Sequence, residues 1–226
     1  INQFSHESKN QFKKKIILCV PNTLIHFFKK KLKSKFISLG VQNCHYHQGY
    51  GPFTGSVNAS MLKKAGAEFI ILGHSENRLE GETNQLIKKK IKSALNEKLN
   101  IIFCIGETLK EKKGGKTFSI IKKQMVSSID KKCNYKKIII AYEPVWSIGT
   151  GKIPKLQELK KIFIFIKSEF RKKFKTKSYP TVLYGGSVND KNINMFSSIP
   201  EIDGFLIGGA SQSSKKFIDI IKNYYK

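Results

Sequence analysis

Glu143 is a lone carboxylate at the end of an apolar run, in the stretch AYEPVWSIGTGK. The run before it, 138–142, has the composition of a strand buried on both faces. A carboxylate fixed at such a strand end is aimed and partly desolvated, as a general base must be. The segment that follows Glu143 has a rigid backbone at Pro144 and a conformationally flexible one at Gly149 and Gly151. This order predicts a general base followed by a mobile lid.

A histidine, His74, follows a second apolar run, 69–72. An imidazole N–H at a strand end can donate a hydrogen bond to a carbonyl oxygen, and Ser75 and Glu76 suit the first turn of a helix. The pair His45 and His47 has no third ligand beside it, so we predict no metal site. The remaining histidines are interpreted as structural: His6, His26, His45 and His47.

Two glycine pairs follow later apolar runs, at 185–186 and 208–209. Backbone N–H groups in such turns can approach an anion closely. Phosphate commonly binds after the last two strands of an eight-stranded (β/α) barrel, which is where both pairs fall. The glycine pairs therefore predict a phosphate site.

The elements that must position these groups are short apolar runs, each followed by an amphipathic segment edged with lysine. Continuous apolar runs are typical of parallel strands, and their alternation with helices indicates an α/β fold. We find no linker or break in composition, so we expect one domain over 1–226. The predicted strands are 16–20, 36–41, 69–72, 101–105, 138–142, 181–184 and 205–207.

A closed (β/α)8 barrel needs eight strands, and its active site lies at the carboxyl ends of those strands. The chain supplies seven runs, and residues 1–15 have the polar, helix-like character of a first helix. We therefore expect a (β/α)8 TIM barrel that is missing its first strand in the chain as given.

Six stretches resemble signatures of the triosephosphate isomerase family, in the family's order, and the likeness runs through 16–226. The resemblance implies a cofactor-free enzyme of glycolysis and gluconeogenesis that interconverts dihydroxyacetone phosphate and D-glyceraldehyde 3-phosphate. The stretches are QNC…GPFTG, ILGHSE, CIGE, YEPVWSIGTGK, YGGSV and DGFLIGGAS.

The resemblance assigns a role to each matching residue. Glu143 would move the proton through an enediol(ate), and His74 would polarise the carbonyl as a neutral imidazole, this family being itself the standard case of a histidine kept neutral in this way. The hinges of the lid would be 144–146 and 152–154, with 148–151 as its tip. Backbone N–H groups that would bind the substrate phosphate belong to Gly149, Ser187, Gly208 and Gly209.

The stretch 42–56 resembles the family's projecting dimer loop, which implies a homodimer, and Thr54 matches the family's threonine there. The alternative is a long surface loop without a partner, although a loop of this length calls for a function. Ser56 stands where the family has an acidic residue, and Asn77 where it has an arginine. Both departures bear on the strength of the dimer.

The family's first strand ends in an Asn-x-Lys stretch whose lysine holds the substrate phosphate, and nothing in this chain matches it. Residues 1–3 resemble the residues that come directly after that lysine. We expect either a longer natural chain or a degraded barrel, and little isomerase activity from the chain as given.

The formal net charge of +26 raises a second hypothesis, an impaired barrel that binds anions or nucleic acid through its lysines. All but two of the 42 Lys+Arg are lysine, whereas specific readout of nucleic acid favours arginine. We therefore predict solvated helix faces and no nucleic-acid partner. A third hypothesis is another phosphate-handling barrel enzyme, such as an epimerase.

The 4 cysteines are far apart and form no CxxC pair, which fits a reducing, cytoplasmic compartment. No apolar run approaches the ~20 residues of a membrane span, so we expect no membrane partner.

Overall fold

The computed structural model describes residues 15–224, which contain two compact units. The first unit comprises the chain up to Gly73, Asn77–Phe103 and Ser128–Ile138. The second comprises His74–Glu76, Cys104–Ser127 and the chain from Ile139 onward. The helix expected within 1–15 lies almost entirely outside the described residues.

The seven strands of the described residues coincide with the seven predicted runs, to within two residues at each end. Each strand is hydrogen-bonded to the next strand along the chain. The strands are β1 Ile16–Val20, β2 Ile37–Val41, β3 Phe69–Leu72, β4 Asn100–Ile105, β5 Ile138–Tyr142, β6 Val182–Tyr184 and β7 Gly204–Phe205.

The strand pairs within each unit are parallel. In the first unit Ile16 pairs with Ile37 and Phe69 with Asn100, which joins β1 to β2 and β3 to β4. In the second unit β5, β6 and β7 are joined in the same way, for example through Tyr142 and Tyr184. Parallel strands bring their carboxyl ends to one edge, so side chains at the ends of β5 and β6 become neighbours.

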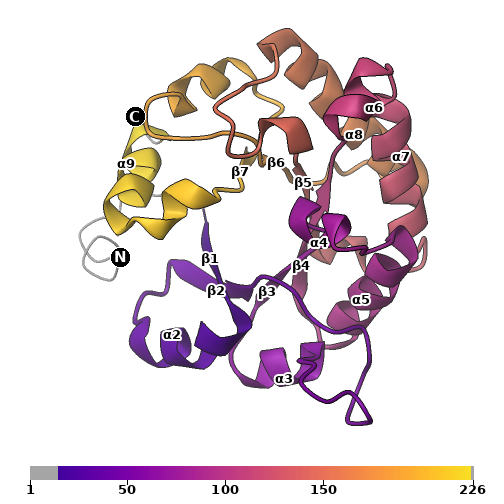
Figure 1. Ribbon diagram of the computed structural model, residues 1–226, viewed down its shortest axis with the longest axis vertical. Coiled ribbons are helices and arrows are strands. Elements are labelled where there is room, and N and C mark those ends of the chain that lie inside the picture. Colours follow the sequence, from indigo (N-terminus) through magenta and orange to yellow (C-terminus); the bar gives the residue numbers. More distant parts are fainter. Residues whose placement is uncertain (1–14, 225–226) are drawn as a thin grey trace. The chain divides into compact units, whose positions relative to one another are not determined.

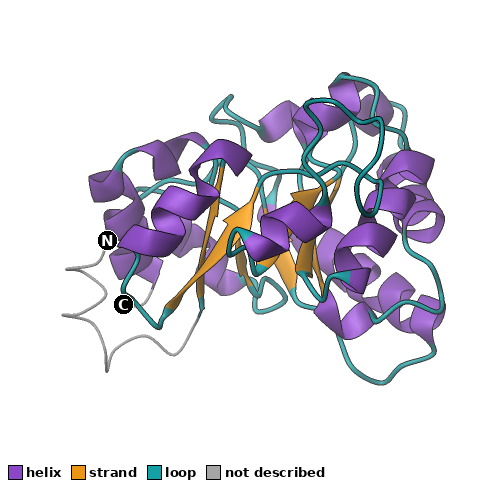
Figure 2. Cartoon of the chain, turned by 90° about the horizontal axis from the view of Figure 1, so that it is seen from below, coloured by secondary structure: helices purple, strands orange, loops and turns teal. Residues whose placement is uncertain are grey.

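Helices alternate with these strands (Figure 1). Helix α2 packs on β2, α5 on β3, and α8 on β6; Figure 2 shows the same elements coloured by type. The α-helices are α2 Ile25–Lys31, α3 Ala59–Lys64, α4 Ser75–Leu79, α5 Asn84–Asn96, α6 Leu109–Lys113, α7 Thr117–Ser128, α8 Leu156–Phe174 and α9 Ser214–Tyr224.

Helix α8 forms because its apolar residues recur at helical spacing along one face. Leu159, Ile162, Phe163 and Ile166 of this stripe are buried, as the sequence predicts. The helix ends where Lys175 adopts a left-handed conformation, with φ of 50°. One buried member was not predicted: Glu169 pairs with Lys122 and Lys172.

Each unit has its own apolar core. Aliphatic side chains dominate the first, and aromatic side chains of β5, β6 and α8 dominate the second. The largest fully buried side chains are Phe103, Leu62, Ile70, Leu72, Ile87, Ile91 and Leu99 in the first unit, and Tyr142, Tyr184, Phe163, Phe170 and Phe196 in the second.

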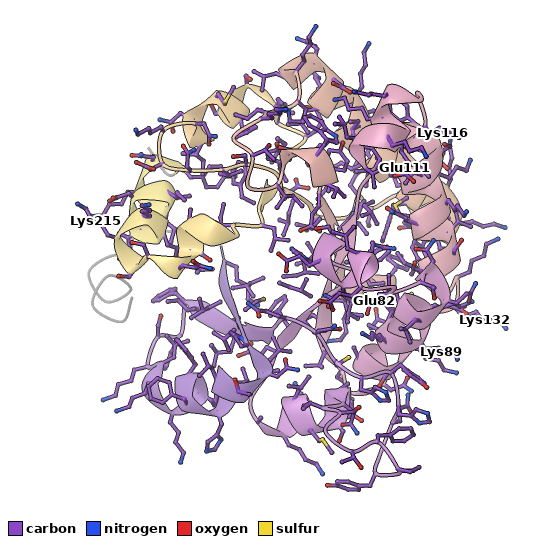
Figure 3. All side chains as sticks on the ribbon, viewed as in Figure 1. Glu82, Lys89, Glu111, Lys116, Lys132 and Lys215 are labelled. Atoms are coloured by element: carbon purple, nitrogen blue, oxygen red, sulfur yellow. The ribbon has the colours of Figure 1, made fainter. Side chains whose placement is uncertain are left out.

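Lysines account for most of the charge, and many of them are exposed. Lys89, Lys116, Lys132 and Lys215, labelled in Figure 3, are exposed and come from four different segments of the chain. Lys89 and Lys215 lie on the helices α5 and α9, whereas Lys116 and Lys132 lie in loops.

Candidate active site

Glu143 directly follows β5 and is 3% exposed. Its backbone N–H donates to the carbonyl of Ile105 at 2.8 Å, which fixes the main chain at this point against the end of β4. Its carboxylate accepts a hydrogen bond from the Ser75 backbone N–H at 3.3 Å. The predicted base is therefore buried and held at both its main chain and its side chain.

His74 lies beside this carboxylate. Its Nε2 is 3.0 Å from Glu143 Oε1, and its side chain is 24% exposed. On the other side of the ring, Nδ1 accepts a hydrogen bond from the Glu76 backbone N–H at 3.4 Å. Because Nδ1 is an acceptor here, this hydrogen-bond network assigns the proton of the neutral ring to Nε2. The ring therefore presents a donor toward Glu143.

The pKa of His74 reflects two opposing influences. Burial lowers it, but the hydrogen bond and negative charge of Glu143, with a further contribution from Glu76, outweigh burial and raise it. The carboxylate thus favours the imidazolium as long as it remains against His74. When the Glu143 carboxylate moves away, burial and the Glu76 N–H at Nδ1 oppose protonation of the His74 ring.

This coupling predicts that Glu143→Gln lowers the pKa of His74. The matched variant Glu76→Gln should lower it less, because Glu76 is exposed and makes the smaller contribution. An NMR titration of the His74 ring measures both. A raised folded-state pKa means that the contact stabilises the fold fully below the ordinary histidine pKa of about 6.5. This stabilisation is lost as the pH rises through the folded-state value. An unchanged pKa in Glu143→Gln would contradict the coupling.

Two glycines form the walls around Glu143. A Cβ on Gly106 would lie 1.8 Å from the Glu143 carbonyl oxygen, and one on Gly185 would lie 2.9 Å from its Cγ. Both distances are far inside van der Waals contact, so only glycine lets β4 and β6 approach the base this closely.

Gly106→Ala should therefore displace the main chain that carries Glu143. We expect a loss of at least about 2 kcal/mol of stability, the scale of overpacking in a core, and a large loss of activity. The control is Gly114→Ala, where the added Cβ has its nearest neighbour at 3.4 Å and φ is −81°. Thermal unfolding and an activity assay compare the two variants. Equal stability and equal activity would show that the backbone at Gly106 has room to shift.

A buried carboxylate, Glu107, holds the first hinge of the predicted lid. It is 1% exposed and accepts hydrogen bonds from the Tyr142 hydroxyl at 3.1 Å and from Trp146 Nε1 at 3.0 Å. Burial raises the pKa of the Glu107 carboxyl, and the hydrogen bond from Trp146 is the largest influence in the opposite direction. Burial likewise raises the pKa of Tyr142 well above its usual value. The hinge is thus tied by its tryptophan to the end of β4.

Ser147 connects the lid to the end of β6. Its hydroxyl lies 3.3 Å from the Tyr184 hydroxyl, donates to the carbonyl of Lys152, and accepts from the Ser187 backbone N–H at 3.3 Å. It is fully buried. The Ser147 side chain therefore joins the second hinge of the predicted lid, at Lys152, to Ser187, the residue after the first glycine pair.

The predicted phosphate-binding residues differ in their surroundings. Gly149, Gly208 and Gly209 are exposed, and a Cβ on any of them would meet nothing within 4 Å. The Ser187 N–H is instead engaged by Ser147. The structure brings His74 and Glu143 together, leaves three of the glycines open, and ties Ser187 to the lid.

Sequence reasoning missed Glu107 and Ser147 as functional candidates. CIGE contains Glu107, and its position one glycine after β4 was the available signal, since His74 and Glu143 also follow strands closely. Ser147 gave no signal, because a serine in a loop has no distinguishing pattern.

The predicted dimer loop, 42–56, belongs to the first unit and is anchored at its base by Asn43. The Asn43 side-chain oxygen accepts from Lys90 Nζ at 2.9 Å, and its amide donates to Asn77 at 3.0 Å. Lys90 also pairs with buried Glu82. Asn77, at the position where an arginine was expected, is thus part of this network.

Two negative findings concern the described part of the chain. Within residues 15–224 no three side chains from histidine, cysteine, aspartate and glutamate gather in a way that could hold a metal ion. Over the same residues, none of the helices combines the length and apolar character needed to cross a membrane.

Parallel strands alternating with helices, with polar groups at the carboxyl ends of the strands, define the class of (β/α)8 barrel enzymes. The family model described as Triosephosphate isomerase matches residues 1–224. The triosephosphate isomerase of Dictyoglomus thermophilum is 41% identical over 99% of this chain and 91% of its own length. That of Zygosaccharomyces bailii is 40% identical over 93% of this chain and 86% of its own.

A solved structure agrees with these sequence matches. The crystal structure of triosephosphate isomerase from Bartonella henselae is 33% identical, with a TM-score of 0.88 over 100% of this chain and 92% of that one. The chain belongs to the triosephosphate isomerase family. It is an isomerase with the (β/α)8 barrel fold, and its described residues supply seven of the strands.

Proposed function

We propose that the chain interconverts dihydroxyacetone phosphate and D-glyceraldehyde 3-phosphate, a step of glycolysis and gluconeogenesis, with Glu143 as base and His74 as electrophile. The observation that carries this assignment is the 3.0 Å approach of Glu143 Oε1 to His74 Nε2 beside a buried strand end. A proton acceptor and a hydrogen-bond donor within one substrate's reach are the two groups that an enolisation requires.

The proton path follows from these two groups. Glu143 takes the proton from the carbon next to the ketone, and the electron pair moves onto the carbonyl oxygen to form the enediolate. His74 donates from Nε2 toward that oxygen while the charge develops. The protonated Glu143 then returns the proton to the former ketone carbon, while the proton of the neighbouring hydroxyl passes by way of His74 Nε2 to the former ketone oxygen, which completes the aldehyde. The reaction moves protons only, so the proposed mechanism requires no cofactor and no metal.

Movement of Glu143 would also set the state of His74. In the structure the carboxylate contacts both the Ser75 N–H and His74. To reach a substrate carbon it must leave His74, and the influence that raises the histidine pKa leaves with it. Burial and the Glu76 N–H at Nδ1 then favour the neutral ring. The substrate would thus meet a neutral donor.

The proposed phosphate site uses the backbone N–H groups of Gly149, Ser187, Gly208 and Gly209. Its support is the open space around three of these glycines and the link from Ser187 through Ser147 to the lid. Gly149 and Gly151 have φ values of 68° and 75°, so the lid tip uses conformations that favour glycine. We propose that 144–154, called the lid from here on, closes over the phosphate and excludes water.

A homodimer through 42–56 is proposed for the first unit. Support comes from the anchored base of this loop and from Tyr50, which is 83% exposed near its tip. An exposed aromatic side chain is typical of an interface anchor. Such an anchor would bury Tyr50 against a second copy of the chain.

Tyr50→Asp should then weaken self-association by at least about tenfold, the effect of losing one interface anchor. The control is Ile164→Asp, since Ile164 is 48% exposed on α8 and outside the loop. Sedimentation equilibrium over a concentration series measures both; equal association of both variants would remove the loop from the interface.

We further propose that residues 1–226 form one domain in the cytoplasm. Strands β4 and β5 each contribute residues to both compact units, which favours joint unfolding. None of the four cysteines forms a disulfide within the described residues, in keeping with a reducing compartment. A single calorimetric transition is expected, and two separated transitions would contradict the single domain.

The test of the function is an NMR assay with purified protein and defined substrates. We expect conversion of D-glyceraldehyde 3-phosphate to dihydroxyacetone phosphate above the uncatalysed rate, although slowly because no residue of the chain as given matches the family's Asn-x-Lys stretch, and no conversion of ribulose 5-phosphate to its epimer. Epimerisation without triose phosphate turnover would favour the third hypothesis. Absence of both activities would contradict the proposal.

A further inference from the structure

The first hinge of the lid contains Trp146, which is the single tryptophan of the chain. Glu107 holds the edge of its indole ring through the Nε1–H hydrogen bond of 3.0 Å. The face of the ring carries a second contact, the Lys112 ammonium at 3.9 Å from the ring centre. An ammonium group at this distance over an indole is attracted by the negative face of the ring.

Lys112 is itself held in place. It belongs to α6, whose start is fixed by a capping box between Thr108 and Glu111. Its Nζ lies 3.0 Å from each carboxylate oxygen of Glu158. Glu158 is in the first turn of α8, which begins directly after the lid ends. One cation therefore links the tryptophan at the start of the lid to the helix at its end.

We infer that Lys112 is a positioning residue that latches the lid in its resting position. The inference rests on the proposed function, because it assumes that the lid closes over a bound phosphate. Glu107 lies just past the end of β4 and Lys112 lies on α6, so both are outside the lid. Trp146 is part of the first hinge and would move with it. Closure that swings Trp146 must break its contact with Lys112, so this contact stabilises only the resting state.

A contact present in one state alone shifts the equilibrium toward that state when it is made, and away from it when it is removed. Lys112→Met keeps the length of the side chain and removes the charge, the contact with Trp146 and the pair with Glu158. The lid of this variant should close more readily. Any anion that requires closure should then bind more tightly, even though a positive charge has been lost.

The experiment uses sn-glycerol 3-phosphate, which carries the phosphate but has no carbonyl to react. Binding is followed by Trp146 fluorescence in the full chain, with acrylamide quenching of the free protein as a second readout. For Lys112→Met we expect about three- to tenfold tighter binding, the scale of a partly exposed cation–π contact, and stronger quenching. Turnover should fall more than KM, because a lid that reopens slowly delays product release.

The control is Lys113→Met, which removes the same charge from the next, exposed residue. Simple electrostatics predicts weaker phosphate binding for both variants, so tighter binding by Lys112→Met alone separates the latch from the loss of charge. Lys112→Arg should restore wild-type behaviour, since a guanidinium can stack on the ring and pair with Glu158. Glu158→Gln should tighten binding less than Lys112→Met.

Equal or weaker binding by Lys112→Met than by Lys113→Met overturns the latch. Thermal melting followed by circular dichroism identifies any variant that has lost its fold. If Lys112→Met does not fold, the latch is tested by Lys112→Arg, which must then bind the phosphate as the wild type does. If the wild type turns over triose phosphate but Lys112→Met does not bind the phosphate more tightly, the latch is rejected and the proposed function is retained. Absence of wild-type turnover rejects the proposed function itself.

Discussion

Glu143→Asp should lower turnover by about 100-fold or more, because removal of one methylene withdraws the carboxylate by ~1 Å from the substrate carbon. The main chain cannot follow to compensate. It is hydrogen-bonded to Ile105 at 2.8 Å and enclosed by Gly106 and Gly185. Substrate affinity should change much less, because the proposed phosphate contacts belong to other residues. Steady-state kinetics on triose phosphate gives both parameters.

The matched control is Glu80→Asp, the same truncation at an exposed carboxylate. It should retain wild-type kinetics. Normal turnover in Glu143→Asp, with the control also normal, would remove Glu143 from the mechanism.

His74→Gln should lower turnover by about 100- to 1000-fold, the loss that follows removal of one positioned donor to a developing oxyanion. A glutamine amide can donate a hydrogen bond, but it has no counterpart of the ring nitrogen Nδ1, which accepts the Glu76 N–H at 3.4 Å. It therefore lacks the contact that orients Nε2. We also expect the pH dependence of turnover that belongs to the histidine to disappear.

His26→Gln is the control for this change, since His26 is exposed on α2. It should leave turnover unchanged. Turnover of His74→Gln within tenfold of the wild type would mean that another group polarises the carbonyl.

The strands were predictable from the sequence because each is an unbroken apolar run bounded by loop residues. Runs such as 69–72 and 138–142 match β3 and β5 at both ends. The last strand was placed one residue late and is shorter than expected: β7 is Gly204–Phe205, and the predicted run was 205–207. Leu206 and Ile207 continue the apolar composition but leave the ladder after one further backbone bond, from Leu206 to Tyr184.

Glu143 and His74 could be singled out as candidates because Glu143 directly follows β5 and His74 follows β3 after one glycine, and the sequence alone locates strand ends. The contacts made by the proposed lid and by the helix that follows it could not be predicted in this way. Glu107 and Trp146 are separated by 39 residues, and Lys112 and Glu158 by 46. Such pairs meet only through the packing of β4, β5, α6 and α8, which no local pattern encodes. A buried polar side chain with partners is visible only in three dimensions.

The anchored base of the dimer loop gives the same lesson in the first unit. Asn77 departs from the family pattern, and the sequence alone suggested a missing contact. In the structure the side chain of Asn43 bridges Lys90 and Asn77. These two hydrogen bonds join residues 34 and 47 positions apart, so they cannot be inferred from one substituted residue.

The central claim is that Glu143 carries the proton between two substrate carbons while His74 polarises the oxygen. The most direct test follows the fate of that proton by running the isomerisation in D2O and reading deuterium at the carbon next to the product carbonyl by NMR. We expect the wild-type chain to incorporate deuterium during turnover, because a protonated Glu143 exchanges with solvent. We also expect Glu143→Gln to incorporate none above the uncatalysed rate, and His74→Gln to slow incorporation and isomerisation together. Incorporation by Glu143→Gln at the wild-type rate would contradict the account.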